Sequence, residues 1–224
     1  GIKGFDKLIG NGFEEESINL VSGGNGSGKT IFAMQFLIEG MKRGENTLYI
    51  TFEESREEFY SNMKQLGFDL LEYERSGKLT FLEYSPEKVK MMLDEGGGAI
   101  ESIVIRKNVK RLVIDSISSF SFLFESASAR RQGILSLFDI IRKWDCTSLF
   151  TLQKDTDNET NDSSASEVQS DSLIELYYPE IKGKRQHFLE VIKMRGTKHS
   201  NQVYPFEIGK GGIKVSSRPT SAKF

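Results

Sequence analysis

Short apolar runs alternate with longer amphipathic segments along most of the chain. Runs of strand length occur at residues 18–22, 47–52, 79–83, 111–115 and 147–152. Segments with apolar residues at helical spacing lie between them, at residues 29–41, 56–66, 85 onward, 99–107 and 130–144. Because strands that alternate with helices pair in parallel, this pattern predicts an α/β fold with a mainly parallel, twisted sheet and helices on both faces.

The helix expected after Ser55 has the clearest boundaries. Ser55 and Glu58 form a capping-box pattern, in which the two side chains bind free backbone N–H groups at the start of a helix. Phe59, Met63 and Leu66 follow at i, i+4 and i+7, which places them on one buried stripe. The glycine after Leu66 then favours the end of the helix.

The last third of the chain has a different pattern. Residues 154–170 are polar and lack periodicity, which predicts a mobile loop. Three strands are expected after it, at 173–178, 187–194 and 203–208, with turns at Lys182-Gly183 and Gly196. We therefore expect one domain over residues 1–215 with a β-rich C-terminal end, followed by a tail over residues 216–224.

The loop between the first predicted strand and helix carries the most specific motif. Gly23 to Thr30 matches the P-loop pattern G-x-x-x-x-G-K-[ST]. The glycines let successive backbone N–H groups face phosphate oxygens, and the helix N-terminus adds its positive dipole end. We expect Lys29 to bridge the β- and γ-phosphates of ATP and the Thr30 hydroxyl to bind Mg²⁺. The predicted nucleotide ligands are Gly24, Asn25, Gly26, Ser27, Gly28, Lys29, Thr30 and Ile31.

Three carboxylates follow predicted strands whose ends should meet the phosphate loop. Asp115 ends an aliphatic run and fits the acidic residue that holds the Mg²⁺ shell, although a helix N-cap is the alternative. Glu53 and Glu54 follow residues 47–52, and hydrolysis needs a carboxylate to orient or deprotonate water. We favour Glu54 as the base and Glu53 as its positioning partner. The alternative is that Glu53 and Glu54 are solvent-exposed acids before the start of a helix and have no catalytic role.

Gln153 ends the strand predicted after Asp115. An amide at this position suits contact with the γ-phosphate of ATP, and it would pass the presence of that phosphate to the adjoining loop. An exposed glutamine at a strand end is the alternative.

Composition and charge narrow the function classes further. A net charge of −2 gives no overall basic field that attracts nucleic acid or an anionic membrane. Cys146 is the only cysteine, which rules out an intramolecular disulfide and suits a reducing cytoplasm. No apolar window is long enough to cross a bilayer, and the N-terminus lacks a signal-peptide pattern. We expect a cytoplasmic protein without membrane contact.

Five segments together resemble the KaiC-like ATPases of the RecA superfamily, especially single-domain archaeal members. These segments are Gly4 to Leu8, Leu20 through the phosphate loop, Tyr49 to Ser55, Val113 to Ser116 and Lys193 to His199. The resemblance covers nearly the whole chain and implies a RecA-like P-loop core. It also implies a homo-oligomeric ring, usually a hexamer, with ATP bound between subunits, and it supports Glu53 and Glu54 as catalytic carboxylates.

The resemblance implies a further role for the last of these segments. Lys193 and Arg195 would approach the γ-phosphate of a neighbour's ATP, with Thr197 and His199 near the nucleotide. The alternative for His199 is a structural histidine at a strand end, whose ring forms hydrogen bonds with the backbone. The clock protein of the family carries a phosphorylated Ser-Thr pair where this chain has Glu167-Val168, so autophosphorylation there does not carry over.

Three functions compete at this point. The first is a slow, ring-forming ATPase that regulates an unidentified protein partner, and the second is a recombination-accessory ATPase that binds DNA. DNA is disfavoured because residues 154–171 hold six acids and one base, and residues 116–131 offer only Arg130 and Arg131. Phe120, Phe122 and Phe124 could stack on bases, but a core or interface role is favoured. The third function is a nucleotide-binding scaffold that does not hydrolyse ATP.

Overall fold

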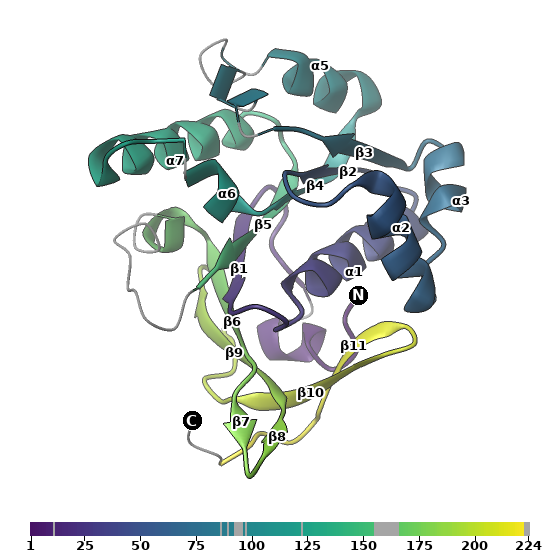
Figure 1. Cartoon of the computed structure of the whole chain (residues 1–224), viewed down its shortest axis with the longest axis vertical. Coiled ribbons are helices and arrows are strands. Elements are labelled where there is room, and N and C mark those ends of the chain that lie inside the picture. Colours follow the sequence, from purple (N-terminus) through teal and green to yellow (C-terminus); the bar gives the residue numbers. More distant parts are fainter. Residues whose placement is uncertain are drawn as a thin grey trace.

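A nine-stranded sheet forms the centre of the computed structural model (Figure 1). The structure describes residues 1–10, 12–85, 87–88, 90–91, 96, 98–121, 123–154 and 166–221. The strand order is β11-β10-β9-β6-β1-β5-β4-β2-β3, parallel from β6 to β3 and antiparallel from β9 to β11. The strands are β1 (Ile18–Gly23), β2 (Asn46–Thr51), β3 (Leu79–Glu83), β4 (Val109–Asp115), β5 (Thr147–Gln153), β6 (Ser172–Tyr177), β9 (His187–Met194), β10 (Tyr204–Gly209) and β11 (Gly212–Val215).

Helices cover both faces of this sheet (Figure 1). One face carries η1 (Asp6–Ile9), α1 (Lys29–Lys42), α2 (Arg56–Gln65) and α3 (Leu70–Arg75). The other face carries α5 (Gly98–Lys107), α6 (Ile117–Ser121) and α7 (Ala127–Arg142). A hairpin of β7 (Glu180–Ile181) and β8 (Lys184–Arg185) lies between β6 and β9 in the chain.

Alternating strand residues divide the apolar interior into two cores. Tyr49 packs in the core beneath α1, whereas its neighbours Leu48 and Ile50 pack in the core beneath α7. Val113 and Leu112 divide between the two cores in the same way on β4. Successive strand side chains point to opposite faces, so a strand buried on both faces is apolar at nearly every position. The α/β fold class predicted from the sequence is confirmed.

The helix predicted after Ser55 is present as α2, and its cap has the expected geometry. The Ser55 Oγ accepts a hydrogen bond from the Glu58 backbone N–H at 3.4 Å and lies 3.2 Å from Glu58 Oε2. Phe59 and Met63 are buried, and Leu66 packs against the same core. Gly67 follows with a φ of 90°, a conformation that glycine adopts without strain.

The sequence pattern did not predict several short elements. The short helix α3 begins after Asp69, whose side chain accepts from the Leu71 N–H, and β11 pairs with β10 immediately before residue 216. The segment after Asp115 contains α6, where the sequence pattern indicated no helix. Serines give α6 little intrinsic helix propensity, but Ile117 and Phe120 are fully buried and hold it against the sheet.

Two of the predictions fall partly outside the described residues. Residues 155–165 of the expected mobile loop lie outside them, and residues 166–169 form a short helical turn. The helix expected from residue 85 is described only at residues 87–88 and 90–91, which are helical. The turn at Lys182-Gly183 is present between β7 and β8, with both residues at positive φ.

The directions of the strands decide where the candidate residues lie. The carboxyl ends of β1, β2, β4 and β5 meet at one edge of the sheet, as parallel register requires. Strand β9 runs the other way, and its last residue Met194 pairs with Ser172, the first residue of β6. Met194 therefore lies at the opposite edge. We call these two sides the carboxyl edge and the amino edge.

Candidate functional site

A cleft of about 420 Å³ opens at the carboxyl edge of the sheet. It brings together the phosphate loop and the ends of β2, β4 and β5, which are far apart in the sequence. The lining residues are Asn25, Gly26, Gly28, Lys29, Thr30, Ile31, Glu53, Asp115, Ser116, Gln153 and Ile208. Most of the cleft residues predicted from the sequence thus share one cavity, and Glu54 is absent from its lining.

The backbone of the phosphate loop suits an anion. Gly26 and Gly28 have φ values of 72° and 99°, which let successive N–H groups turn toward one side, and α1 begins at Lys29. A Cβ atom on Gly23 would lie 2.3 Å from the Leu176 carbonyl oxygen, so only glycine fits where the loop leaves β1. The loop therefore has the fold and dipole of a phosphate-binding site.

Lys29 and Gln153 contact each other at the base of the cleft. The Lys29 ammonium donates to the carbonyl oxygens of Gly23 at 2.8 Å and Gly24 at 2.9 Å, and to Gln153 Oε1 at 2.9 Å. The Gln153 backbone N–H donates to Ser118 Oγ at 2.8 Å, which fixes the end of β5 against α6. The amide thus lies directly beside the cation of the phosphate loop.

Hydrogen bonds hold the Asp115 carboxylate at the end of β4. Thr30 Oγ1 donates to Asp115 Oδ2 at 2.8 Å, and the Tyr49 hydroxyl donates to the same oxygen at 2.7 Å. Thr151 donates to the other oxygen, Oδ1. Burial raises the pKa of Tyr49 well above its ordinary value, and the Asp115 charge raises it further, so the phenol stays a donor.

The arrangement of Thr30 and Asp115 fits Mg²⁺. A hydroxyl and a carboxylate are the hard oxygen donors that Mg²⁺ prefers, and the ion commonly takes its remaining ligands from water and phosphate. Among the described residues, no group of three or more His, Cys, Asp or Glu side chains could hold a metal ion.

Glu53 and Glu54 point to different surroundings. Glu53 Oε1 accepts from Ser116 Oγ at 3.3 Å and also from Ser119 Oγ, and Glu53 lines the cleft. Partial burial raises the pKa of the Glu54 carboxyl, and the charge of Asp115 adds to the rise. Glu53 therefore lines the cleft and Glu54 does not, whereas the sequence favoured Glu54 as the base.

Lys193 and Arg195 lie at the amino edge, away from this cleft. The Lys193 ammonium donates to the carbonyl oxygens of Glu167 at 3.1 Å, Val168 at 2.9 Å and Ser170 at 2.6 Å. Arg195 donates to the same Val168 oxygen at 3.0 Å and pairs with Asp171 at 3.4 Å. Burial and the nearby Arg195 charge lower the pKa of Lys193.

Thr197 and His199 share the amino edge with these cations. Thr197 Oγ1 donates to Glu14 Oε1 at 3.0 Å, and His199 Nδ1 lies 2.9 Å from the Ser200 carbonyl oxygen. The structure therefore separates the candidate residues into two groups on one chain.

The sequence did not point to several residues that complete the cleft. Tyr49 and Thr151 hold Asp115, Ser119 holds Glu53, and Ile208 of β10 adds an apolar wall. Ile208 Cδ1 would lie 3.0 Å from a Cβ atom on Gly28. Strand alternation gave a partial signal, because Thr151 and Tyr49 are polar groups on strands that are buried on both faces.

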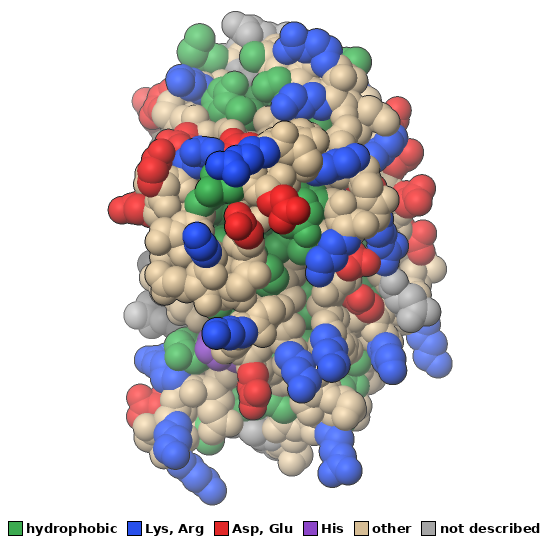
Figure 2. All heavy atoms as spheres, turned by 90° about the vertical axis from the view of Figure 1, so that its right-hand side faces the viewer, with side chains coloured by type: hydrophobic (Ala, Val, Ile, Leu, Met, Phe, Trp, Pro, Cys, Tyr) green, Lys and Arg blue, Asp and Glu red, His purple; other side chains and the backbone are tan. Residues whose placement is uncertain are grey.

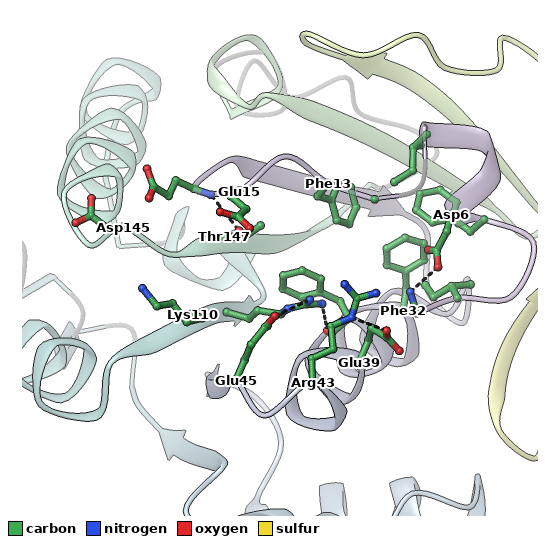
Figure 3. Close-up of a pocket in the computed structure, with 18 residues that line it drawn as sticks. Asp6, Phe13, Glu15, Phe32, Glu39, Arg43, Glu45, Lys110, Asp145 and Thr147 are labelled. Atoms are coloured by element: carbon green, nitrogen blue, oxygen red, sulfur yellow. Dashed lines mark hydrogen bonds and ion pairs between the residues drawn. The ribbon is translucent and has the colours of Figure 1, made fainter.

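A second cavity of about 340 Å³ lies at the amino edge, between the N-terminal segment and α1 (Figure 3). Its cations are largely paired within the cavity wall: Arg43 contacts Glu39 at 2.7 Å and Arg111 contacts Glu45 at 2.5 Å (Figure 3). None of the candidate residues lines it. The cleft at the carboxyl edge is therefore the candidate site.

Comparison with known families agrees with this geometry. The family model described as "ATPase: KaiC" matches residues 1–220. The chain belongs to the KaiC ATPase family. A UPF0273 protein of Pyrococcus horikoshii is 35% identical over 96% of this chain and 92% of its own length. The circadian clock protein KaiC3 of Synechocystis is 33% identical over 96% of this chain, which spans 44% of that longer protein.

A solved structure from the same family is similar throughout. The KaiC-like protein of Pyrococcus horikoshii has a TM-score of 0.85 and 34% identity, and the match covers 96% of each chain. This similarity confirms the RecA-like core with its antiparallel C-terminal strands. Membership of the KaiC family supports nucleotide binding by a RecA-type ATPase domain. Within the described residues, no helix is long and apolar enough to span a membrane.

Proposed function

We propose that this protein binds ATP with Mg²⁺ in the carboxyl-edge cleft and hydrolyses it in a ring of identical subunits. The observation that carries the proposal is the separation of the catalytic groups. The phosphate loop, Asp115 and Glu53 share one cleft, whereas Lys193 and Arg195 lie at the other edge of the same chain. A complete site then needs the edges of two subunits.

Each cleft residue has a defined task in this proposal. The loop N–H groups and Lys29 bind the phosphates, while Thr30 and Asp115 hold Mg²⁺. The ion supplies neutralisation of charge on the phosphate oxygens. Ile31 and Ile208 form apolar surface at the cleft wall, which suits a nucleobase. Gln153 accepts a hydrogen bond from Lys29, so a change in the phosphates bound by Lys29 would change the contacts of Gln153.

We assign the role of general base to Glu53. Its carboxylate lines the cleft and is fixed by Ser116 and Ser119, so it is positioned before water arrives. Glu54 lies outside the lining of the cleft, so we assign it a supporting role. Positioned carboxylates of this kind contribute about a hundredfold or more to such reactions.

The two cations at the amino edge suit a phosphate brought by a neighbour. Arg195 aligns with Asp171 and Ile18 at the start of β1, whereas the phosphate loop follows the end of β1, about 17 Å further along the strand. This distance excludes direct contact between Arg195 and the phosphates of its own chain. Arg195 remains 53% exposed, and the apolar Val168 beside it is 60% exposed. An exposed cation beside an exposed apolar residue fits a subunit interface.

Regulation of a protein partner is favoured over DNA binding. Phe120 is fully buried and Phe124 packs against it, so neither stacks on a base, and Phe122 lies outside the described residues. On the face that bears α2 and α3, acidic and basic side chains are interspersed, with Lys and Arg more frequent toward the end where β10 and β11 lie (Figure 2).

Turnover and assembly mass together test the proposal. ATP hydrolysis is measured with and without single-stranded DNA, and the mass of the particle is measured with and without nucleotide. We expect slow hydrolysis that DNA does not change, in a ring stabilised by nucleotide. Strong DNA stimulation favours the recombination-accessory alternative. Nucleotide binding without hydrolysis favours a scaffold.

A further inference from the structure

Lys154 lies between the two groups of candidate residues. It follows Gln153, and its backbone N–H donates to the Gly23 carbonyl oxygen at 3.1 Å. Its ammonium contacts Glu175 Oε2 at 2.7 Å and Glu167 Oε1 at 3.0 Å. Burial opposes its charge, but the hydrogen bond to Glu175 and the ion pair with Glu167 prevail and raise the pKa of Lys154. Lys154 is therefore a fixed, charged link between β5 and the turn that contains Glu167.

Glu167 belongs to the helical turn at residues 166–169, which Lys193 and Arg195 contact through hydrogen bonds. The carbonyl oxygen of Glu167 itself accepts from Lys193, and the next carbonyl oxygen, of Val168, accepts from both Lys193 and Arg195. A shift of this turn necessarily changes the surroundings of both cations. The Glu167 side chain and backbone thus join Lys154 on one side to Lys193 on the other.

The link begins at the phosphate loop. An ammonium has three N–H groups, and three oxygen acceptors, from Gly23, Gly24 and Gln153, already lie within hydrogen-bond distance of Lys29. A phosphate oxygen that binds Lys29 competes with these acceptors. The Gln153 side chain is the acceptor with rotatable bonds, so it is the one expected to move, and Lys154 is the next residue.

We propose that Lys154 and Glu167 are positioning residues, which set Lys193 and Arg195 at the amino edge according to the nucleotide in the chain's own cleft. The chain of contacts runs from Lys29 through Gln153 and Lys154 to the Glu167 turn. This inference rests on the proposed function, because the cations act on the neighbour's ATP. When a nucleotide binds in the cleft of one subunit, that subunit then positions its Lys193 and Arg195 for the ATP of the adjacent subunit.

Single substitutions give the first test. Lys154→Met removes the charge at similar length, and we expect turnover to fall about tenfold while ATP affinity stays unchanged. Lys154→Arg should restore most of the loss. Glu167→Gln should lower turnover as well, and the double variant should be no worse than Lys154→Met alone, because both act through one contact. Lys107→Met is the matched control, because the Lys107 ammonium donates to the Thr80 hydroxyl at 2.9 Å on β3, which ends the strand order on the side away from β6 and β9.

Wild-type turnover in Lys154→Met overturns the proposal. Additive losses in the double variant also overturn it, because they would mean that the two residues act independently. A fall in ATP affinity that matches the fall in turnover would assign Lys154 to its own phosphate loop instead.

Mixed rings show on which site Lys154 acts. Subunits with Lys154→Met keep an intact Glu53, and subunits with Glu53→Gln keep intact positioning of Arg195. In a random one-to-one mixture, about a quarter of the interfaces pair the cleft of a Lys154→Met subunit, with Glu53 intact, with the correctly positioned Arg195 of a Glu53→Gln subunit. Turnover should then exceed the mean of the separate preparations by about fivefold, for a tenfold single effect. No excess in verified mixed rings means that Lys154 serves its own cleft.

A parallel mixture of Glu53→Gln with Arg195→Ala separates this inference from the function on which it rests. Recovery in the Arg195 mixture without recovery in the Lys154 mixture overturns only the positioning role. Failure of both mixtures overturns the assignment of the cations to a neighbour's site, and the positioning role with it.

Discussion

The carboxyl edge and the amino edge of the sheet are organised differently. At the carboxyl edge the side chains hold one another, with Thr30 and Tyr49 bound to Asp115 and Ser119 bound to Glu53. At the amino edge the two cations bind mainly backbone carbonyl oxygens, and Arg195 keeps half of its surface exposed. The candidate residues at the carboxyl edge line a cleft, whereas Arg195 at the amino edge presents its charge outward.

This difference follows from strand direction. Parallel strands bring their carboxyl ends to one edge, where loops from β1, β2, β4 and β5 converge. The antiparallel β9 sends its last residues to the opposite edge. The antiparallel β9 therefore brings Lys193 and Arg195 to the amino edge, where the proposed function assigns them to a neighbour's site. Each subunit would carry two half-sites rather than one whole site.

The largest effect is expected from loss of the phosphate-loop cation. Lys29→Ala should abolish tight binding of ATP with Mg²⁺, because it removes the charge that faces the phosphates. Lys42→Ala, an exposed lysine at the end of the same helix, is the control and should bind normally. Equilibrium binding of a fluorescent ATP analogue measures both. If the Lys29→Ala variant folds and its affinity for ATP is unchanged, the assignment of Gly23 to Thr30 as the phosphate-binding loop is wrong.

The next effect separates the paired glutamates. Glu53→Gln should keep ATP binding and lower turnover about a hundredfold, since the amide cannot accept the proton of water. Glu54→Gln should cost less, because Glu54 does not line the cleft. Turnover and affinity measured on both variants decide the order. A larger loss in Glu54→Gln would restore the order that the sequence favoured.

A smaller effect is expected from Ser119. Ser119→Ala removes one of the two hydroxyls that hold Glu53, and Ser116 remains. We expect turnover to fall about tenfold with unchanged ATP affinity, because only the orientation of the base is relaxed. Combining Ser119→Ala with Glu53→Gln should add nothing to Glu53→Gln alone. An additive loss would show that Ser119 acts elsewhere.

The smallest effect is expected from Tyr49. Tyr49→Phe removes one hydrogen bond to Asp115, worth about 1 kcal/mol, and should raise the Mg²⁺ concentration for half-maximal turnover about fivefold. Tyr177→Phe removes a similar hydroxyl contact, with Glu190 at 3.1 Å on β9, and serves as the control. It should leave the Mg²⁺ dependence unchanged. Equal Mg²⁺ dependence in both variants would mean that Tyr49 only stabilises the fold.

Much of the carboxyl edge was predictable from the sequence because its signals are local. The phosphate loop, the aliphatic run before Asp115 and the capping box after Glu54 each fix a short element. The helix α6 was not predictable, because its serines favour no helix and only the burial of Ile117 and Phe120 stabilises it. The hydroxyls of Ser119 and Tyr49 were missed, since their partners lie 66 residues away in the chain.

The amino edge could be predicted only in part. One residue separates Lys193 from Arg195, a spacing that predicts both side chains on one face of a strand, and both do contact the Val168 carbonyl oxygen. Which edge they occupy depends on the antiparallel pairing of β9 with β6, a long-range property that no local pattern encodes. Glu167 and Lys154 were similarly out of reach, because a polar stretch of sequence gives no sign of which acid pairs with which base.

The most direct measurement of the central claim mixes two inactive subunits. Co-expression with different tags gives rings that contain both Glu53→Gln and Arg195→Ala subunits, and the mixed rings are purified through both tags. If Arg195 acts on the neighbour's ATP, interfaces that pair an intact Glu53 with an intact Arg195 regain full turnover, at about a quarter of the sites. If Arg195 served its own cleft, no site in the mixture would be complete. Absence of recovery in verified mixed rings would therefore contradict a site shared between subunits.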